Sequence, residues 1–128
     1  MNIRRTAVLA AAPALLLVLS AAPALASGGG NDVRSSGPCA TGSWKLKAKI
    51  DNGRLAVESE VDTNRVGQAW SWKLSDNGTQ FASGSATTAA PSGSFSIRRT
   101  TANRPGPDTV RLVATRGSSV CRGVVTLR

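Results

Sequence analysis

The sequence contains no histidine, no tyrosine and only two cysteines. Histidine is the commonest general base and the commonest protein ligand for transition metals, so its absence removes the usual catalytic and metal-binding sets. We therefore predict that the protein is not an enzyme, that it has no catalytic residues, and that it takes no cofactor and no metal ion.

The remaining side chains offer two weak catalytic arrangements. Ser71 and Lys73 share one face of a predicted strand, but a lysine acts as a base only where burial or a neighbour removes its proton. Glu58 and Glu60 share a face two residues apart, and paired carboxylates can hydrolyse glycosides at suitable separations. Lysines alternate along the preceding predicted strand, so we interpret the two glutamates as part of a solvated charge ladder.

The N-terminal segment has the features of a secretory signal peptide. Arg4 and Arg5 precede an apolar stretch over residues 7–19, and Ala24-Leu25-Ala26 provides a small-x-small cleavage site. Pro13 interrupts the stretch, which is also too short to cross a membrane. We expect cleavage after Ala26 and a secreted, extracellular product, and the Ala-, Gly- and Arg-rich composition is typical of bacteria of the actinobacterial kind.

Removal of a signal peptide over residues 1–26 changes the composition. The formal net charge of +9 falls to +7 without the two arginines of the signal. Residues 27–38 are rich in Gly, Ser and Asn and are predicted to form a flexible leader. Residues 39–128 have the size of one ordinary domain.

The two cysteines, Cys39 and Cys121, lie near the two ends of the mature chain. An even number of cysteines in an exported protein usually indicates pairing, so we predict one disulfide. Two free thiols are the alternative, but the sequence has no C-x-x-C motif that would indicate redox chemistry.

Hydrophobic residues recur at every second position, which is typical of half-buried strands, and no stretch of the mature chain has a helical period. The hairpin signal Asp51-Asn52-Gly53 separates the first two segments. Further turn signals occupy residues 75–78 and 105–108. The pattern predicts seven strands over residues 44–50, 55–61, 68–74, 79–81, 93–97, 110–114 and 121–127.

This pattern resembles the immunoglobulin and fibronectin type III superfamily. The resemblance rests on the strand count, on Trp70 and Trp72 in the third strand, and on residues 105–114 leading into the sixth. It implies an all-β, seven-stranded antiparallel immunoglobulin-like sandwich with one disulfide, in which the first and last strands are neighbours. The chain departs from antibody domains because its cysteines lie outside the second and sixth strands and because it has no tyrosine corner.

The basic residues are the main candidates for a binding surface. If the third, sixth and seventh strands share a sheet, its outer face collects Lys73, Arg111 and Arg122. Arg98, Arg99 and Arg104 are expected at strand ends or in loops. A basic field attracts anionic surfaces, although a merely solubilising surface is the alternative interpretation.

We expect a secreted non-enzymatic binding module that docks an anionic cell-envelope or extracellular partner through this basic surface. One alternative is an inhibitor or protein-interaction module that presents the loop at residues 86–94 or 101–108. Another is a carbohydrate-binding module that stacks sugars on exposed Trp44 and Trp70. Trp70 and Trp72 share a face with Leu74, which favours the core for both, and the exposure of Trp44 stays open. The arginines lack interleaved aromatics for base stacking, so sequence-specific binding of nucleic acid is not expected. We expect a monomer.

Overall fold

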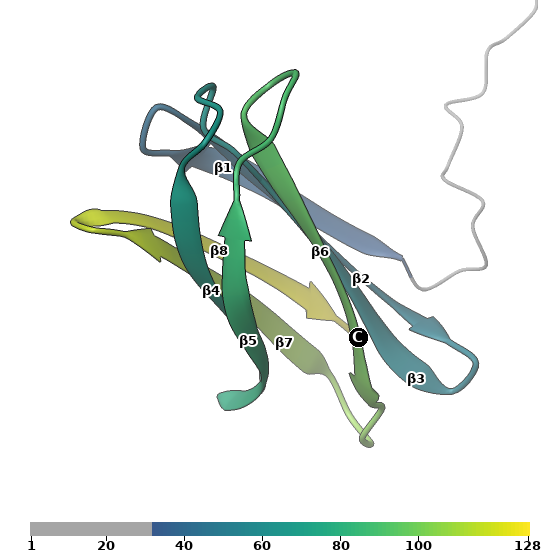
Figure 1. Ribbon diagram of the computed structural model, residues 1–128. Helices are drawn as coiled ribbons and strands as arrows, with labels where there is room; N and C mark the ends of the chain where they lie inside the picture. Colours follow the sequence, from purple (N-terminus) through teal and green to yellow (C-terminus); the bar gives the residue numbers. More distant parts are fainter. Residues whose placement is uncertain (1–31) are drawn as a thin grey trace, which may run out of the picture.

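The computed structural model describes residues 32–128, and within them it is all-β (Figure 1). The predicted signal peptide and residues 27–31 of the predicted leader lie outside the described residues. No helix of the described part is long and apolar enough to cross a membrane. The strands are β1 (Val33–Cys39), β2 (Gly42–Asp51), β3 (Arg54–Asp62), β4 (Ala69–Asp76), β5 (Thr79–Thr87), β6 (Ser94–Ala102), β7 (Asp108–Arg116) and β8 (Ser119–Leu127).

The strands form two antiparallel sheets of four strands each, which face one another as a sandwich (Figure 1). Sheet A has the order β1-β2-β3-β6, and sheet B has the order β5-β4-β7-β8. The predicted third, sixth and seventh strands correspond to β4, β7 and β8, which are adjacent in sheet B as expected.

The sandwich has eight strands and not seven, because β1 was not predicted. The predicted leader over residues 27–38 is therefore corrected, since residues 33–38 belong to β1 and pair with β2 in register from Val33 opposite Ala48. The segment carries a single large apolar side chain, so it has almost no alternating signal. An edge strand of small residues is held chiefly by its backbone hydrogen bonds, which composition does not reveal.

The inward positions of both sheets form one core, as the alternation predicts. The core residues occupy every second position of their strands. They include Leu46, Leu55, Val57, Val61, Leu74, Ile97, Val110, Leu112 and Val125. Trp72 is 3% exposed and lies in this core as predicted. Trp44 and Trp70 are also buried, with 8% and 2% of their surface exposed. This confirms the core position favoured for Trp70 and contradicts the alternative in which both rings are exposed for stacking on sugars.

Glycines on neighbouring strands explain how the tryptophans fit between the sheets. A Cβ atom at Gly123 of β8 would lie 2.6 Å from Cε3 of Trp44, and one at Gly37 of β1 would lie 2.9 Å from Nε1 of the same ring. On the other side of the sandwich, a Cβ atom at Gly84 of β5 would lie 2.8 Å from Cζ2 of Trp72. The two large rings therefore occupy space that any other residue at these positions would take.

The disulfide between Cys39 and Cys121 is present as predicted, with 5.0 Å between the Cα atoms. Cys39 ends β1 of sheet A and Cys121 lies in β8 of sheet B. The bond therefore joins the two sheets at the side of the sandwich where β1 and β8 pack together.

Replacing both cysteines by serine should lower the free energy of unfolding by roughly 4 kcal/mol, because the bond closes a loop of 82 residues in the unfolded chain. Urea denaturation of the variant and the wild type measures the difference. A loss below about 1 kcal/mol would show that the bond adds little to the packing of the sheets.

Gly123→Ala should lower the free energy of unfolding by about 1–3 kcal/mol, because the new methyl group overlaps the ring of Trp44. The same denaturation experiment measures the change. Thr126→Ala, at an exposed position of the same strand, is the control and should change stability by less than about 0.5 kcal/mol. Equal stability of both variants would contradict the close packing of Trp44 against β8.

Candidate functional site

The outer face of sheet A carries charges of both signs in nearly equal number. Its cations are Arg34, Lys45, Lys47, Lys49, Arg54 and Arg98, and its carboxylates are Asp32, Asp51, Glu58, Glu60 and Asp62. Six cations against five carboxylates leave this face close to neutral.

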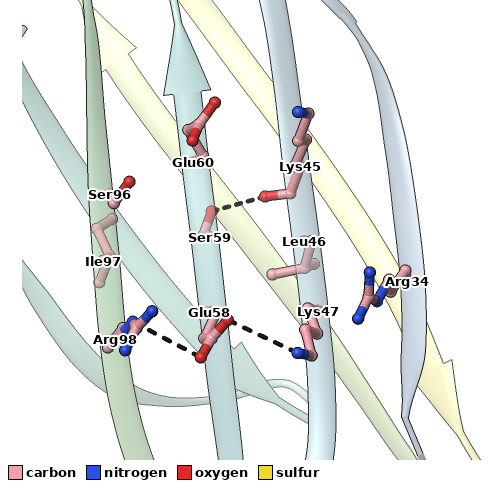
Figure 2. A pocket seen from close by; sticks show the side chains of 10 residues that line it. All are labelled: Arg34, Lys45, Leu46, Lys47, Glu58, Ser59, Glu60, Ser96, Ile97 and Arg98. Atoms are coloured by element: carbon pink, nitrogen blue, oxygen red, sulfur yellow. Dashed lines mark hydrogen bonds and ion pairs between the residues drawn. The ribbon is translucent and has the colours of Figure 1, made fainter. Parts of the chain in front are cut away.

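The register of sheet A places these opposite charges side by side (Figure 2). Glu58 lies between Lys47 and Arg98, with Oε2 3.9 Å from Lys47 Nζ and Oε1 3.6 Å from Arg98 Nε. Lys45 is directly opposite Glu60. The predicted charge ladder is confirmed, and its residues line a shallow depression of about 300 Å³.

The ladder continues to the start of the described chain. Asp32 Oδ2 lies 3.3 Å from Arg34 Nη2 and 3.5 Å from Lys47 Nζ. The hydrogen bond from Arg34, together with the attraction of both cations, lowers the pKa of Asp32. Such surface pairs add little stability, but they neutralise the cations of sheet A locally.

The outer face of sheet B is different because its charged side chains are all cationic. Lys73 of β4 is opposite Val113 of β7, which is in turn opposite Arg122 of β8. Arg111 lies two residues before Val113 on the same face, and all three cations are exposed. Since adjacent strands are about 4.8 Å apart, their Cα atoms fall within roughly 10 Å of one another.

All seven acidic side chains of the sequence lie outside this face. Five of the seven acidic residues lie on the outer face of sheet A, and the other two, Asp76 and Asp108, are buried on the inner face of sheet B. The other strand residues on the outer face of sheet B are neutral, mostly Ser, Thr and Val. We call this surface, centred on Lys73, Arg111 and Arg122, the basic face.

The other three predicted surface cations do not join the basic face. Arg98 and Arg99 lie within β6 and not at a strand end, which corrects the prediction for them. Arg98 belongs to the ladder of sheet A, and the Cζ atom of Arg99 lies 5.0 Å from the ring centre of Trp72. Arg104 lies in the loop between β6 and β7, where its charge acts on Asp76. The predicted basic set is therefore divided over several parts of the molecule.

The turn signals at residues 75–78 and 105–108 predict exposed loops for Asp76 and Asp108, but in the structure the two side chains form a buried carboxyl pair. Asp76 is opposite Val110, and Asp108 lies two residues before Val110 on the same inner face. Asp76 is two residues after Leu74, and Asp108 is two residues before Val110. Because alternate residues of a strand point to the same side, both carboxyl groups lie on the inner face with these buried residues. Each has a buried Oδ1 atom without a hydrogen-bond partner among the described residues.

Burial raises the pKa of Asp76 from 3.8 to about 6, with further contributions from a hydrogen bond to Asp108 and from the negative charge of Asp108. Arg104 opposes this shift by attracting the ionised form. A proton on Asp76 therefore lets the two carboxyl groups approach without two unshielded charges.

The same end of the sandwich is held by Asn77. Its Nδ2 atom donates to the Pro107 carbonyl at 3.1 Å, and its Oδ1 atom accepts from the Thr109 amide at 2.9 Å. These bonds tie the turn after β4 to the start of β7 and fix the strands that carry the carboxyl pair.

Neither metal binding nor similarity to known proteins assigns a role to these sites. Residues 32–128 contain no group of three or more His, Cys, Asp or Glu side chains that could hold a metal ion. No protein-family model, no curated protein and no solved structure matches the chain. The geometry and charge of the chain itself are therefore what indicate its function.

The carboxyl pair makes stability depend on pH. Because the folded state holds the proton of Asp76 more tightly than the unfolded state does, the contribution of this group to stability is greatest below pH 4 and is lost as pH rises through 6. Between pH 4 and 7 this group should cost on the order of 2 kcal/mol. Asp76→Asn should remove that loss, as measured by urea denaturation at several pH values.

Asp51→Asn, at an exposed position in the β2–β3 hairpin, is the matched control and should keep the pH dependence of the wild type. If Asp76→Asn loses stability with pH as steeply as the wild type does, the carboxyl pair is not the source.

Proposed function

We propose that the protein is a secreted, non-enzymatic binding module that docks an anionic polymer of the cell envelope or the extracellular medium on its basic face. The observation that carries this proposal is the collection of three exposed cations on one sheet face that has no carboxylate side chain. Secretion is supported by the predicted signal peptide and by a disulfide, which suits an oxidising compartment.

The chemistry of the basic face suits repeated phosphate or sulfate groups. Arg111 and Arg122 can each donate two parallel hydrogen bonds to such a group, and Lys73 adds a point charge. The surrounding Ser and Thr hydroxyls supply further donors. A polyanion that contacts several cations releases its counterions, so its binding weakens steeply as salt rises.

The outer face of sheet A is a poorer site for the same ligand, although it carries more cations. Lys47 and Arg98 already lie beside Glu58, so a polyanion would have to compete with a carboxylate held in place by the sheet. Glu60 and Asp62 on the same strand would repel it.

The strand order supports the immunoglobulin-like interpretation as part of this proposal. In sheet B, β4 corresponds to strand C of immunoglobulin domains. Strand β5, which follows β4 and pairs with it, corresponds to the extra strand that follows strand C in variable-type domains. The order β2-β3-β6 then corresponds to strands A, B and E, with β1 as an addition at the edge. Such sandwiches carry many binding functions, so the fold agrees with a binding module without identifying its ligand.

The triple variant Lys73→Gln, Arg111→Gln, Arg122→Gln should elute from immobilised long-chain polyphosphate at clearly lower salt than the wild type. Three lost contacts should reduce the slope of log affinity against log salt by about 2. The elution midpoint and its dependence on salt are the measurements.

The control is the triple variant Lys45→Gln, Lys49→Gln, Arg54→Gln, which removes the same charge from sheet A and should elute close to the wild type. Equal weakening of both variants would show that net charge alone drives retention. A wild type that elutes without added salt would reject the proposal outright.

A further inference from the structure

The two sheets have four edge strands, and three of them carry residues that discourage pairing with another chain. Strand β1 has Arg34 and Pro38, β6 has Arg98 and Arg99, and β8 has Arg122. Charged residues and proline on an edge are the usual means by which β-proteins prevent edge-to-edge association.

The fourth edge strand, β5, has neither a charged residue nor a proline over Thr79–Thr87. A register shift opposite Leu74 and Ser75 disturbs its beginning, but Ala82 to Thr87 pair regularly with β4. This regular part consists of Ala, Ser, Gly and Thr and is mostly exposed. Within residues 32–128, β5 is hydrogen-bonded to β4 on one side, and no described strand pairs with its other backbone edge, although β5 also contacts β6 of sheet A.

We infer that β5 is a self-association edge, which pairs antiparallel with β5 of a second copy of this chain about a twofold axis. The charges on the four edge strands indicate a second copy of this chain as the partner of β5. Self-pairing of a strand brings its own residues opposite one another, and like charges placed opposite are destabilising. Only β5, among the four edge strands, can pair with itself in any register without placing arginines together.

The alternation of β5 restricts the register further. Ser83 and Ser85 face outward with Lys73 and Ser71, whereas Ala82 and Ala86 face inward. A pairing centred on Gly84 sets Ser83 opposite Ser85 of the second copy and Ala82 opposite Ala86. Small side chains thus meet on both faces, and the outer faces of the two copies stay on the same side.

Such a dimer has a functional consequence that goes beyond binding by a single domain. It joins the two copies of sheet B into one continuous sheet, so the basic faces lie on the same surface and present six cations to one polymer. A ligand that spans both copies gains avidity from the second contact. The sequence alone led us to expect a monomer, because composition does not show which edge lacks protection.

Analytical ultracentrifugation without any polymer tests the association separately from polyanion binding. We expect a reversible dimer with a Kd below about 1 mM. The double variant Ser83→Lys, Ser85→Lys places lysines beside the twofold axis and should raise the Kd at least about tenfold. Val124→Lys, Thr126→Lys adds the same charge to exposed positions of β8, at the opposite edge of sheet B, and should still dimerise.

A wild type that stays monomeric at about 1 mM would overturn the inference. So would a dimer that the β5 variant leaves intact, or one that the β8 variant disrupts. None of these results bears on whether one domain binds polyphosphate, because no polymer is present. The substituted serines are exposed, so the unfolding midpoint of the β5 variant should match that of the wild type.

Discussion

The packing of the two inner sheet faces against one another is the constraint on which the rest of the structure depends. Successive side chains of a strand point to opposite faces of the sheet. Where alternate side chains of a strand enter the core, the side chains between them therefore face water. The rings of Trp44 and Trp72 make the constraint strict, because each occupies space that glycines on neighbouring strands leave free. The disulfide holds the sheets together beside β1 and β8, and the position of each surface charge follows from this arrangement.

The charge distribution is the functional result of that arrangement. On the outer face of sheet A, Glu58 and Glu60 of β3 lie opposite Lys47 and Lys45 of β2, and this pairing of opposite charges neutralises the face. The outward-facing residues of β4, β7 and β8 are all either cationic or neutral. The two remaining carboxylates, Asp76 and Asp108, point inward and do not lie on the basic face.

The sequence was informative wherever alternation was strong. It predicted that Glu58 and Glu60 form a charge ladder with the lysines of the preceding strand, and that Lys73, Arg111 and Arg122 gather on one sheet face, because both depend on the alternation of side chains and on strand order. It failed for β1, whose small residues carry no pattern. It left the burial of Trp44 open, because that burial depends on Gly37 and Gly123 in other strands. The sequence did not predict the burial of Asp76 and Asp108, because the turn residues beside them indicated loops. Their spacing of two residues from the buried Leu74 and Val110 was the signal that pointed inward.

The binding claim is tested most directly by a titration of the isotope-labelled protein with polyphosphate, followed by two-dimensional NMR of backbone and arginine side-chain resonances. The account predicts that the largest shifts fall on Lys73, Arg111, Arg122 and their neighbours in β4, β7 and β8. Shifts concentrated on the sheet A ladder around Glu58, or spread evenly over both faces, would contradict it.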